Sequence, residues 1–273
     1  MPTPTQTIFI HTALPCEARP LIERFRLKKD LSSHPFEVYS QDQISLTVTG
    51  IGKCAMAAGV AYTQARVGMA DKPIMLNIGI AGHGDHEVGR VFLAGKIIDA
   101  DTRKNYYPPL VFSPPCPAET LRTASNPQLD YSEPYLYDME ASAFYETAMR
   151  FSSGELIQTL KVVSDNRHSP AQNLQPNQVA ELIAAQLPVV NSLLAELRGL
   201  QSLISAPEPA QIQTLLERFH LTANERQQLR NQLLRWECLA GGKKLNIDQV
   251  SCKNGKEVLA WLARQIDSLD YVL

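Results

Sequence analysis

The chain has 273 residues, 44% of them hydrophobic and 20% charged, which is the composition of a globular protein able to bury a large core. A formal net charge of −2 gives no general electrostatic reason to expect binding to nucleic acid or to a membrane surface. The five cysteines lack a Cys-x-x-Cys pair, which argues for reduced thiols and against a disulfide framework or a zinc knuckle. No apolar run reaches ~18 residues and the N-terminus lacks a signal-peptide pattern, so we expect a cytoplasmic protein.

Strands and helices are predicted to alternate along most of the chain. Apolar runs predict strands over residues 7–12, 36–39, 44–48, 73–80, 89–100, 120–124 and 156–163. Amphipathic or Ala-rich segments predict helices from residue 17, over 53–67, from residue 138, and over 176–200, 210–239 and 256–269. We therefore expect an α/β domain over residues 1–204. The Pro-containing segment 205–209 predicts a linker, so that residues 205–273 form a helical C-terminal extension.

Small residues follow two of the predicted strands, at residues 50–52 and 79–84. Glycines at such places let the backbone approach a ligand closely, with helix N–H groups facing it. The first segment is not a phosphate-binding P-loop, because the first glycine of that motif is missing and Cys54 replaces Ser or Thr. His83 lies within the second segment, Asp85 and His86 follow it, and all three have the chemistry of metal ligands. No fourth ligand is near them in this glycine-rich stretch, so we interpret them as loop residues and expect no metal.

Two carboxylates begin helices in the predicted order of elements. Glu17 lies just past the first strand, in the first turn of the helix that follows. Glu140 lies in the first turn of a helix that Asp138 is expected to cap, where unpaired N–H groups and the helix dipole favour an ionised side chain. The buried face of that helix is predicted to carry Ala141, Phe144, Tyr145 and Ala148.

A third carboxylate, Asp165, closes the buried strand at residues 156–163. Ligands in open α/β sheets bind at the carboxyl ends of the strands, so Glu17, Glu140 and Asp165 are candidates for one site. Each has an ordinary alternative, because acids stabilise helix starts and Ser-Asp-Asn is common turn chemistry. Position along the chain does not decide between these interpretations.

Five motifs in this order resemble the nucleoside phosphorylase/nucleosidase superfamily, and most closely its methylthioadenosine/S-adenosylhomocysteine nucleosidases. They are Ala13-Leu14-Pro15-Cys16-Glu17, Thr49-Gly50-Ile51-Gly52-Lys53, Asn77-Ile78-Gly79-Ile80-Ala81-Gly82, Asp138-Met139-Glu140-Ala141 and Val163-Ser164-Asp165. The resemblance covers about residues 5 to 200. It implies a three-layer fold with a mixed, partly closed central sheet flanked by helices.

The resemblance also implies the role of each carboxylate in cleaving an N-glycosidic bond. Asp165 would protonate a purine ring nitrogen, Glu17 would orient the attacking water, and Glu140 would bind the ribose hydroxyls. Such cleavage builds positive charge on the sugar, so an acid for the leaving base and a base for the water are its natural requirements. The residues expected to contact the nucleoside are Glu140, Met139, Ser164, Ile80, Ala81, Gly82, Gly50 and Ile51. No cofactor is expected, and a homo-oligomer, with a dimer favoured, is the expected assembly.

Two other functions remain open at the level of sequence. Phosphorylases of this superfamily carry an arginine just before the Gly-x-x-Gly segment, where this chain has Asn77, so hydrolysis is favoured over phosphorolysis. A nucleoside-binding regulatory protein without turnover is the third possibility, with residues 205–273 as its working surface. Ile80 and Lys161 stand where these nucleosidases often have Ser and Arg. The segment between Thr123 and Met139 is short and shows no aromatic clearly placed to stack on a purine.

Overall fold

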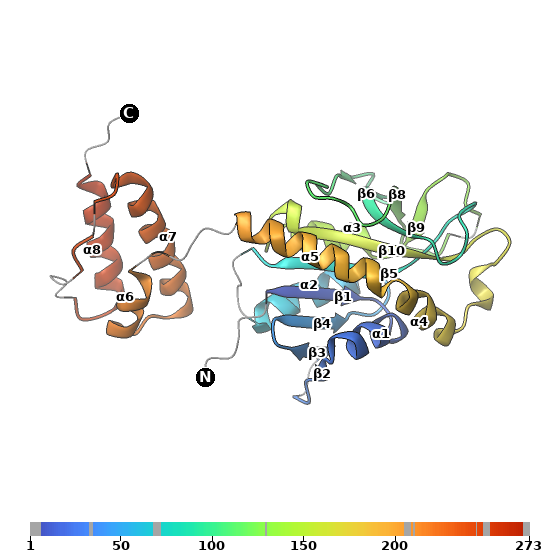
Figure 1. Cartoon of the computed structure of the whole chain (residues 1–273), viewed down its shortest axis with the longest axis horizontal. Coiled ribbons are helices and arrows are strands. Elements are labelled where there is room, and N and C mark those ends of the chain that lie inside the picture. Colours follow the sequence, from blue (N-terminus) through green and yellow to red (C-terminus); the bar gives the residue numbers. More distant parts are fainter. Residues whose placement is uncertain are drawn as a thin grey trace. The chain divides into compact units, whose positions relative to one another are not determined.

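The computed structural model describes residues 7–32, 35–67, 72–128, 130–204, 209, 211–243, 245–247 and 252–269. The chain divides into two compact units, Met1–Ser205 and Ala206–Leu273, and each is described by itself. Residues 205–208 and 210, which include most of the predicted linker, lie outside the described part. Figure 1 labels most of the elements of both units.

The N-terminal unit is built on one mixed sheet of ten described strands. They are β1 (Ile8–Thr12), β2 (Lys28–Lys29), β3 (Glu37–Gln41), β4 (Ile44–Val48), β5 (Ile74–Gly82), β6 (Val91–Asp99), β7 (Asn105–Tyr106), β8 (Ala118–Thr123), β9 (Leu136–Asp138) and β10 (Ile157–Asp165). Strand order is β10-β6-β8-β9-β5-β1-β4-β3-β2, with β7 beside β6. Because β10 also pairs in parallel with β5, the first five strands of this order close on themselves and the rest form an open extension.

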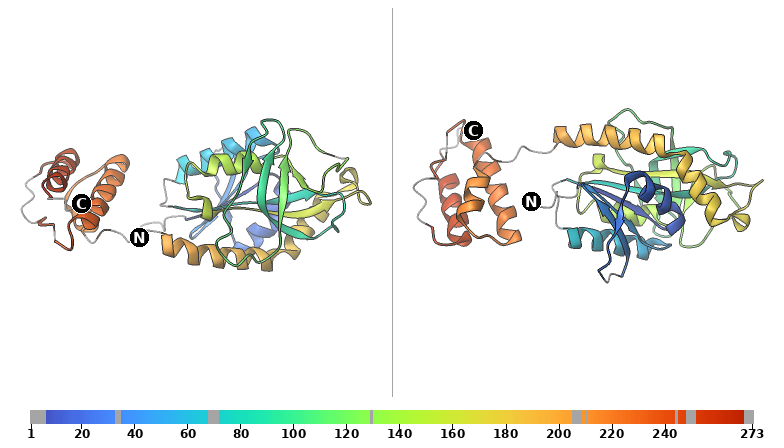
Figure 2. Two further views of the ribbon diagram at one scale, coloured as in Figure 1. Left: turned by 90° about the horizontal axis from the view of Figure 1, so that it is seen from above. Right: turned by 60° about the horizontal axis from the view of Figure 1, so that its bottom comes forward.

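Helices cover both faces of the open part of the sheet, so this unit has three layers. They are α1 (Pro15–Phe25), α2 (Lys53–Val67), α3 (Ala141–Ala148), α4 (Pro176–Ala185) and α5 (Leu187–Ile204). In both views of Figure 2 the strands lie between α2 on one side and α5 on the other. The expectation of a three-layer α/β fold with a partly closed mixed sheet is confirmed.

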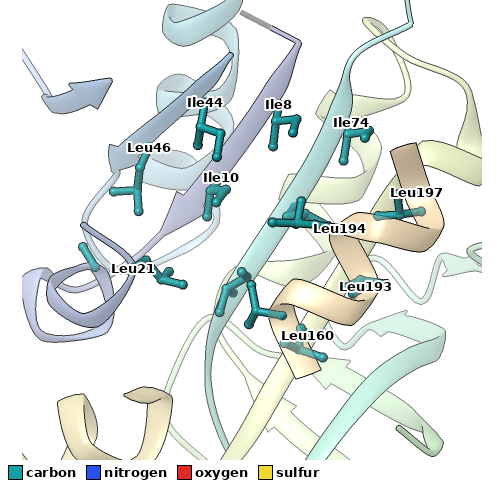
Figure 3. Close-up of a cluster of buried hydrophobic side chains, with 14 of the residues drawn as sticks. Ile8, Ile10, Leu21, Ile44, Leu46, Ile74, Leu160, Leu193, Leu194 and Leu197 are labelled. Atoms are coloured by element: carbon teal, nitrogen blue, oxygen red, sulfur yellow. The ribbon is translucent and has the colours of Figure 1, made fainter. Parts of the chain in front are cut away.

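Alternate residues of the strands supply two separate cores. On one face, Ile8, Ile10 and Leu46 pack with the inner side of α5, whose Leu193, Leu194 and Leu197 are buried (Figure 3). On the other face, strand and helix residues such as Met75, Met56 and Phe144 are fully buried together. Since strand side chains alternate between faces, the nearly continuous apolar runs of the sequence fill both cores.

The segment predicted as one helix over residues 176–200 forms two helices, with an angle of 52° between them. The prediction of a single continuous helix was therefore wrong. Pro188 explains the break, because it has no N–H to donate to the preceding turn and disfavours helical backbone in the residue before it. Within the described residues no single helix is long and apolar enough to cross a membrane, although this bent pair meets that criterion when taken together.

The C-terminal unit consists of α6 (Ile212–Arg218), α7 (Ala223–Leu239) and α8 (Gly255–Asp267) around its own apolar core. The helix predicted over 210–239 is therefore interrupted. Thr222 begins α7 with a capping box, in which its hydroxyl accepts from Glu225 N and its own N–H donates to the Glu225 carboxylate. Leu215, Leu229, Leu233, Val258 and Leu262 are almost fully buried in this core.

Candidate functional site

A cavity of about 170 Å³ lies at the carboxyl ends of β1, β5 and β10. It is lined by Ala13, Leu14, Glu17, Ile51, Ile80, Ala81, Gly82, Pro127, Gln128, Tyr137, Asp138, Met139, Glu140, Ser164, Asp165 and Ala171. The structure thus brings together Glu17, Glu140 and Asp165, which are widely separated in sequence. Four carboxylates line the cavity, and none of its described lining residues is Lys or Arg.

Glu17 is held by backbone N–H groups from two chain segments. Its Oε2 accepts hydrogen bonds from Ala13 N at 2.9 Å and Leu14 N at 2.8 Å, and its Oε1 accepts from Ile80 N at 2.9 Å. Burial raises the pKa of the Glu17 carboxyl, against the opposing effects of Lys161 and of these three N–H groups. The Glu17 carboxylate is therefore fixed in direction, and its pKa is higher than that of an exposed glutamate.

Glu140 precedes α3, which begins at Ala141, so it lies one residue before the helical turn in which the sequence placed it. Its Oε1 accepts from Gly52 N at 2.8 Å, at the turn between β4 and α2, whereas Asp138 Oδ2 accepts from Ala141 N. Burial first, and then the charge of Asp138, raise the pKa of Glu140 to about 7. Burial thus has a larger effect on the pKa of Glu140 than the backbone N–H of Gly52, which lowers it.

Asp165 ends β10 and is nearly buried, with 7% of its surface exposed. The Ser164 hydroxyl donates to its Oδ1, and the Tyr131 hydroxyl donates to its Oδ2. Tyr131 comes from the loop between β8 and β9, and sequence reasoning missed it. An aromatic residue in a polar loop was the available signal, but the folding back of that loop onto β10 is not visible in a sequence pattern.

A buried ion pair lies beside the carboxylates. Lys161, on β10, is 2% exposed, and its Nζ lies 3.0 Å from Asp138 Oδ2. Gly79 explains how this lysine comes near Glu17, since a Cβ on Gly79 would lie 2.7 Å from Glu17 Oε1 and 3.3 Å from Lys161 Nζ. Burial alone would lower the pKa of Lys161, but the carboxylates of Asp138, Glu140 and Glu17 raise it, so the lysine stays charged.

Most predicted contact residues lie at the cavity and one does not. Ile51, Ile80, Ala81, Gly82, Met139 and Ser164 line it, together with the three carboxylates. Gly50 is absent from the described lining, and its positive φ of 86° instead shapes the turn that presents Ile51. Asn77, used above to disfavour phosphate, faces the sheet interior, where its Nδ2 donates to His11 O at 3.2 Å. Sequence reasoning did not predict Ala13, Leu14, Pro127, Gln128, Tyr137, Asp138 and Ala171 as lining residues.

His83 organises the loop that follows β5. Its Nδ1 accepts from Asp85 N at 3.0 Å and from His86 N at 2.9 Å, and its ring stacks on that of His86. His83 is buried, so it is an internal support of the loop and not a surface residue as the loop interpretation implied. In the part of the chain that the structure describes, no three His, Cys, Asp or Glu side chains are grouped to hold a metal ion.

A second cavity, of about 580 Å³, shares Ser164 with the first. It lies between the segment after β10 and helix α4, and its lining includes His168, Asn173, Gln178 and Glu181. The shared serine places the two cavities next to each other. Together they offer more room than the first cavity alone.

Solved structures identify the fold. A 5′-methylthioadenosine/S-adenosylhomocysteine nucleosidase from Helicobacter pylori, in complex with butyl-thio-DADMe-Immucillin-A, matches with a TM-score of 0.57 at 13% identity, over 70% of this chain and 99% of that one. The 5′-methylthioadenosine nucleosidase of Arabidopsis thaliana matches with a TM-score of 0.56 at 18% identity, over 72% and 97%. The futalosine hydrolase of H. pylori matches with a TM-score of 0.56 at 13% identity, over 70% and 98%.

Strand order, closed mixed sheet and these matches together define the chain as having the nucleoside phosphorylase/nucleosidase fold. Within that fold, it matches structures of methylthioadenosine/S-adenosylhomocysteine nucleosidases and of a futalosine hydrolase. No model of a protein family and no curated protein sequence matches the chain.

Proposed function

We propose that this protein is a nucleosidase that hydrolyses the N-glycosidic bond of a purine nucleoside. Nucleosides with a modified 5′ position, such as methylthioadenosine or S-adenosylhomocysteine, are the first candidates. One observation carries the proposal: Glu17, Glu140 and Asp165 line a single cavity at the carboxyl ends of the strands. The nucleosidases and the futalosine hydrolase of the same fold add support.

In the proposed reaction, the bond between C1′ and the base nitrogen breaks and its electrons stay with the base. Asp165 gives its proton to a ring nitrogen, so that the base leaves as a neutral molecule. A water oxygen bonds to C1′ and loses a proton to Glu17. A general base works best when its pKa lies near the operating pH, and burial shifts Glu17 in that direction.

The sugar is assigned to the turn at residues 50–52 and to the segment 138–140. Glu140 accepts from Gly52 N through Oε1, and its Oε2 is only weakly engaged, at 3.3 Å from Met139 N. A ribose hydroxyl is a suitable donor to that oxygen. The second cavity is proposed to receive the part of the substrate that the first is too small to enclose, since pockets for ligands of this size are typically ~300–1,000 Å³.

Water is favoured over phosphate as the acceptor of the sugar. None of the residues described as lining the cavity is Lys or Arg, the side chains that usually bind a phosphate dianion. This argument replaces the one from Asn77, whose side chain faces the interior of the sheet.

The test is a panel of purine nucleosides, with and without 5′ substituents, incubated in the presence and absence of phosphate. Release of a free sugar in both conditions supports hydrolysis. Formation of the sugar 1-phosphate, only with phosphate, would make the protein a phosphorylase. Binding of a nucleoside without cleavage in either condition would reject an enzymatic role and favour a regulatory protein.

A further inference from the structure

Tyr131 contacts Asp165 but is not among the residues described as lining the cavity. Only 2% of its surface is exposed, and its hydroxyl donates to Asp165 Oδ2. Asp165 itself lines the cavity. The tyrosine therefore acts on the carboxyl from the protein side and leaves the cavity side of Asp165 open to a ligand.

Several contacts fix Tyr131 in this position. Arg167 Nη2 donates to Tyr131 O at 2.8 Å, and the Tyr131 ring lies tilted against the Tyr137 ring with centroids 5.9 Å apart. The backbone of Tyr131 has a φ of 44°, a left-handed conformation that is unfavourable for a bulky residue and that these contacts must maintain. A Cβ on Gly82 would lie 2.6 Å from Asp165 Oδ2 and 2.8 Å from Tyr131 Cε1, so glycine is required there.

We propose that Tyr131 is a positioning residue, which orients Asp165 and stabilises the carboxylate that remains after Asp165 has given its proton to the base. This inference rests on the proposed function. Each carboxylate oxygen has two lone pairs, so Oδ2 can accept from Tyr131 and still face the base. A hydrogen bond to a carboxylate is stronger than one to the neutral acid, so it lowers the free energy of the state after proton transfer more than that of the state before it.

A different position of Tyr131 would reverse the expected effect of removing its hydroxyl. If Tyr131 instead occupied the position of the base, its hydroxyl would have to leave Asp165 before substrate could bind. Removing that hydroxyl would then increase binding and turnover. The two arrangements therefore differ in the sign of the effect of Tyr131→Phe.

The experiment compares Tyr131→Phe with Tyr106→Phe as a matched control. Tyr106 also donates its hydroxyl to a carboxylate, Glu146 Oε2 at 2.7 Å, and neither residue lines the cavity. The first substrate is the best nucleoside of the panel, whose base requires protonation. The second is 4-nitrophenyl riboside, whose leaving group departs as a stable anion without a proton.

We expect Tyr131→Phe to lower kcat for the nucleoside roughly 10- to 100-fold, the effect of losing a hydrogen bond to a charged group. For the nitrophenyl riboside we expect kcat within about twofold of wild type, because the acid is not needed there. Tyr106→Phe should leave both unchanged. An equal loss of kcat with both substrates would mean that Tyr131 has only a structural role. A higher kcat with the nucleoside would mean that Tyr131 occupies the position of the base. Either result overturns the proposal.

Measuring the affinity for free adenine tests the role of Tyr131 separately from the proposed function. If the wild type cleaves no nucleoside, the proposed function fails, and the role of Tyr131 is then decided by calorimetric titration with free adenine. Weaker binding to Tyr131→Phe than to wild type and to Tyr106→Phe supports positioning of Asp165. Equal or tighter binding rejects it.

Discussion

Lys161 Nζ lies 3.0 Å from Asp138 Oδ2, and the two side chains are 2% and 1% exposed. A buried pair of this kind contributes little relative to an apolar pair of the same shape, but removing one partner leaves an uncompensated charge in the interior. Here the penalty is larger than for an isolated pair, because Glu17 and Glu140 also depend on the lysine for compensation.

Lys161→Met should therefore lower the free energy of unfolding by at least about 3–5 kcal/mol at neutral pH. Urea denaturation followed by circular dichroism measures it. The control is Lys29→Met, which breaks the exposed ion pair with Glu37 at 2.9 Å and should cost at most about 1 kcal/mol. Equal losses in the two variants would mean that Lys161 carries no special electrostatic role.

Asp165→Asn and Glu17→Gln should each lower nucleoside turnover by at least ~100-fold while the protein stays folded, since general acid and base groups contribute ~10²–10⁴-fold. Asparagine and glutamine keep the shape of each side chain and remove its proton chemistry. Initial rates of sugar release measure the effect, and thermal unfolding verifies the fold. Wild-type rates in either variant would remove that residue from the mechanism.

Glu140→Gln should change how stability depends on pH. The folded protein raises the pKa of Glu140 from 4.5 to about 7, so the folded state binds this proton more tightly than the unfolded chain does. Its contribution to stability is complete below pH 4.5 and is lost as the pH rises through about 7. Between pH 5 and pH 8 the free energy of unfolding of the variant should therefore rise relative to that of the wild type, by at most about 3 kcal/mol.

Denaturant unfolding of both proteins at the two pH values measures that gain. Glu37→Gln is a suitable control, because Tyr39 and Lys29 lower the pKa of Glu37 below 4.5, so this side chain stays ionised and the stability difference from wild type should hardly change between the two pH values. A stability difference between Glu140→Gln and wild type that does not vary with pH would show that Glu140 titrates normally.

Gly82→Ala should impair the site directly, because the added methyl would lie within 3 Å of both Asp165 Oδ2 and Tyr131 Cε1. We expect a loss of ~1–3 kcal/mol from overpacking, together with a lower kcat. Gly199→Ala on α5 is the control, since nothing lies within 4 Å of its Cβ, and it should be neutral or stabilising by up to ~1 kcal/mol. A fully active Gly82→Ala would contradict the close packing described here.

The alternation of strands and helices and the positions of the three carboxylates could be predicted from local patterns, whereas the mixed, partly closed sheet was implied only by the resemblance to the nucleoside phosphorylase/nucleosidase superfamily. Short sequence patterns indicate strand ends, glycine turns and helix starts. The carboxyl ends of parallel strands lie at the same edge of a sheet, so residues at those ends lie close together. The pairing of Lys161 with Asp138 could not be predicted, because it depends on the register that places β10 beside β5. Tyr131 was missed for a similar reason, since its position is set by a loop and not by a periodic element.

The three hydrogen bonds that fix Glu17 come from the segment after β1 and from β5, two strands that pair directly. The Glu17 carboxylate therefore keeps this orientation only while β1 and β5 are paired. A chain in which these two strands have separated contains every residue of the site and yet has no fixed orientation of Glu17. Under the proposed mechanism, hydrolysis therefore depends on the pairing of β1 with β5 as well as on the residues of the site.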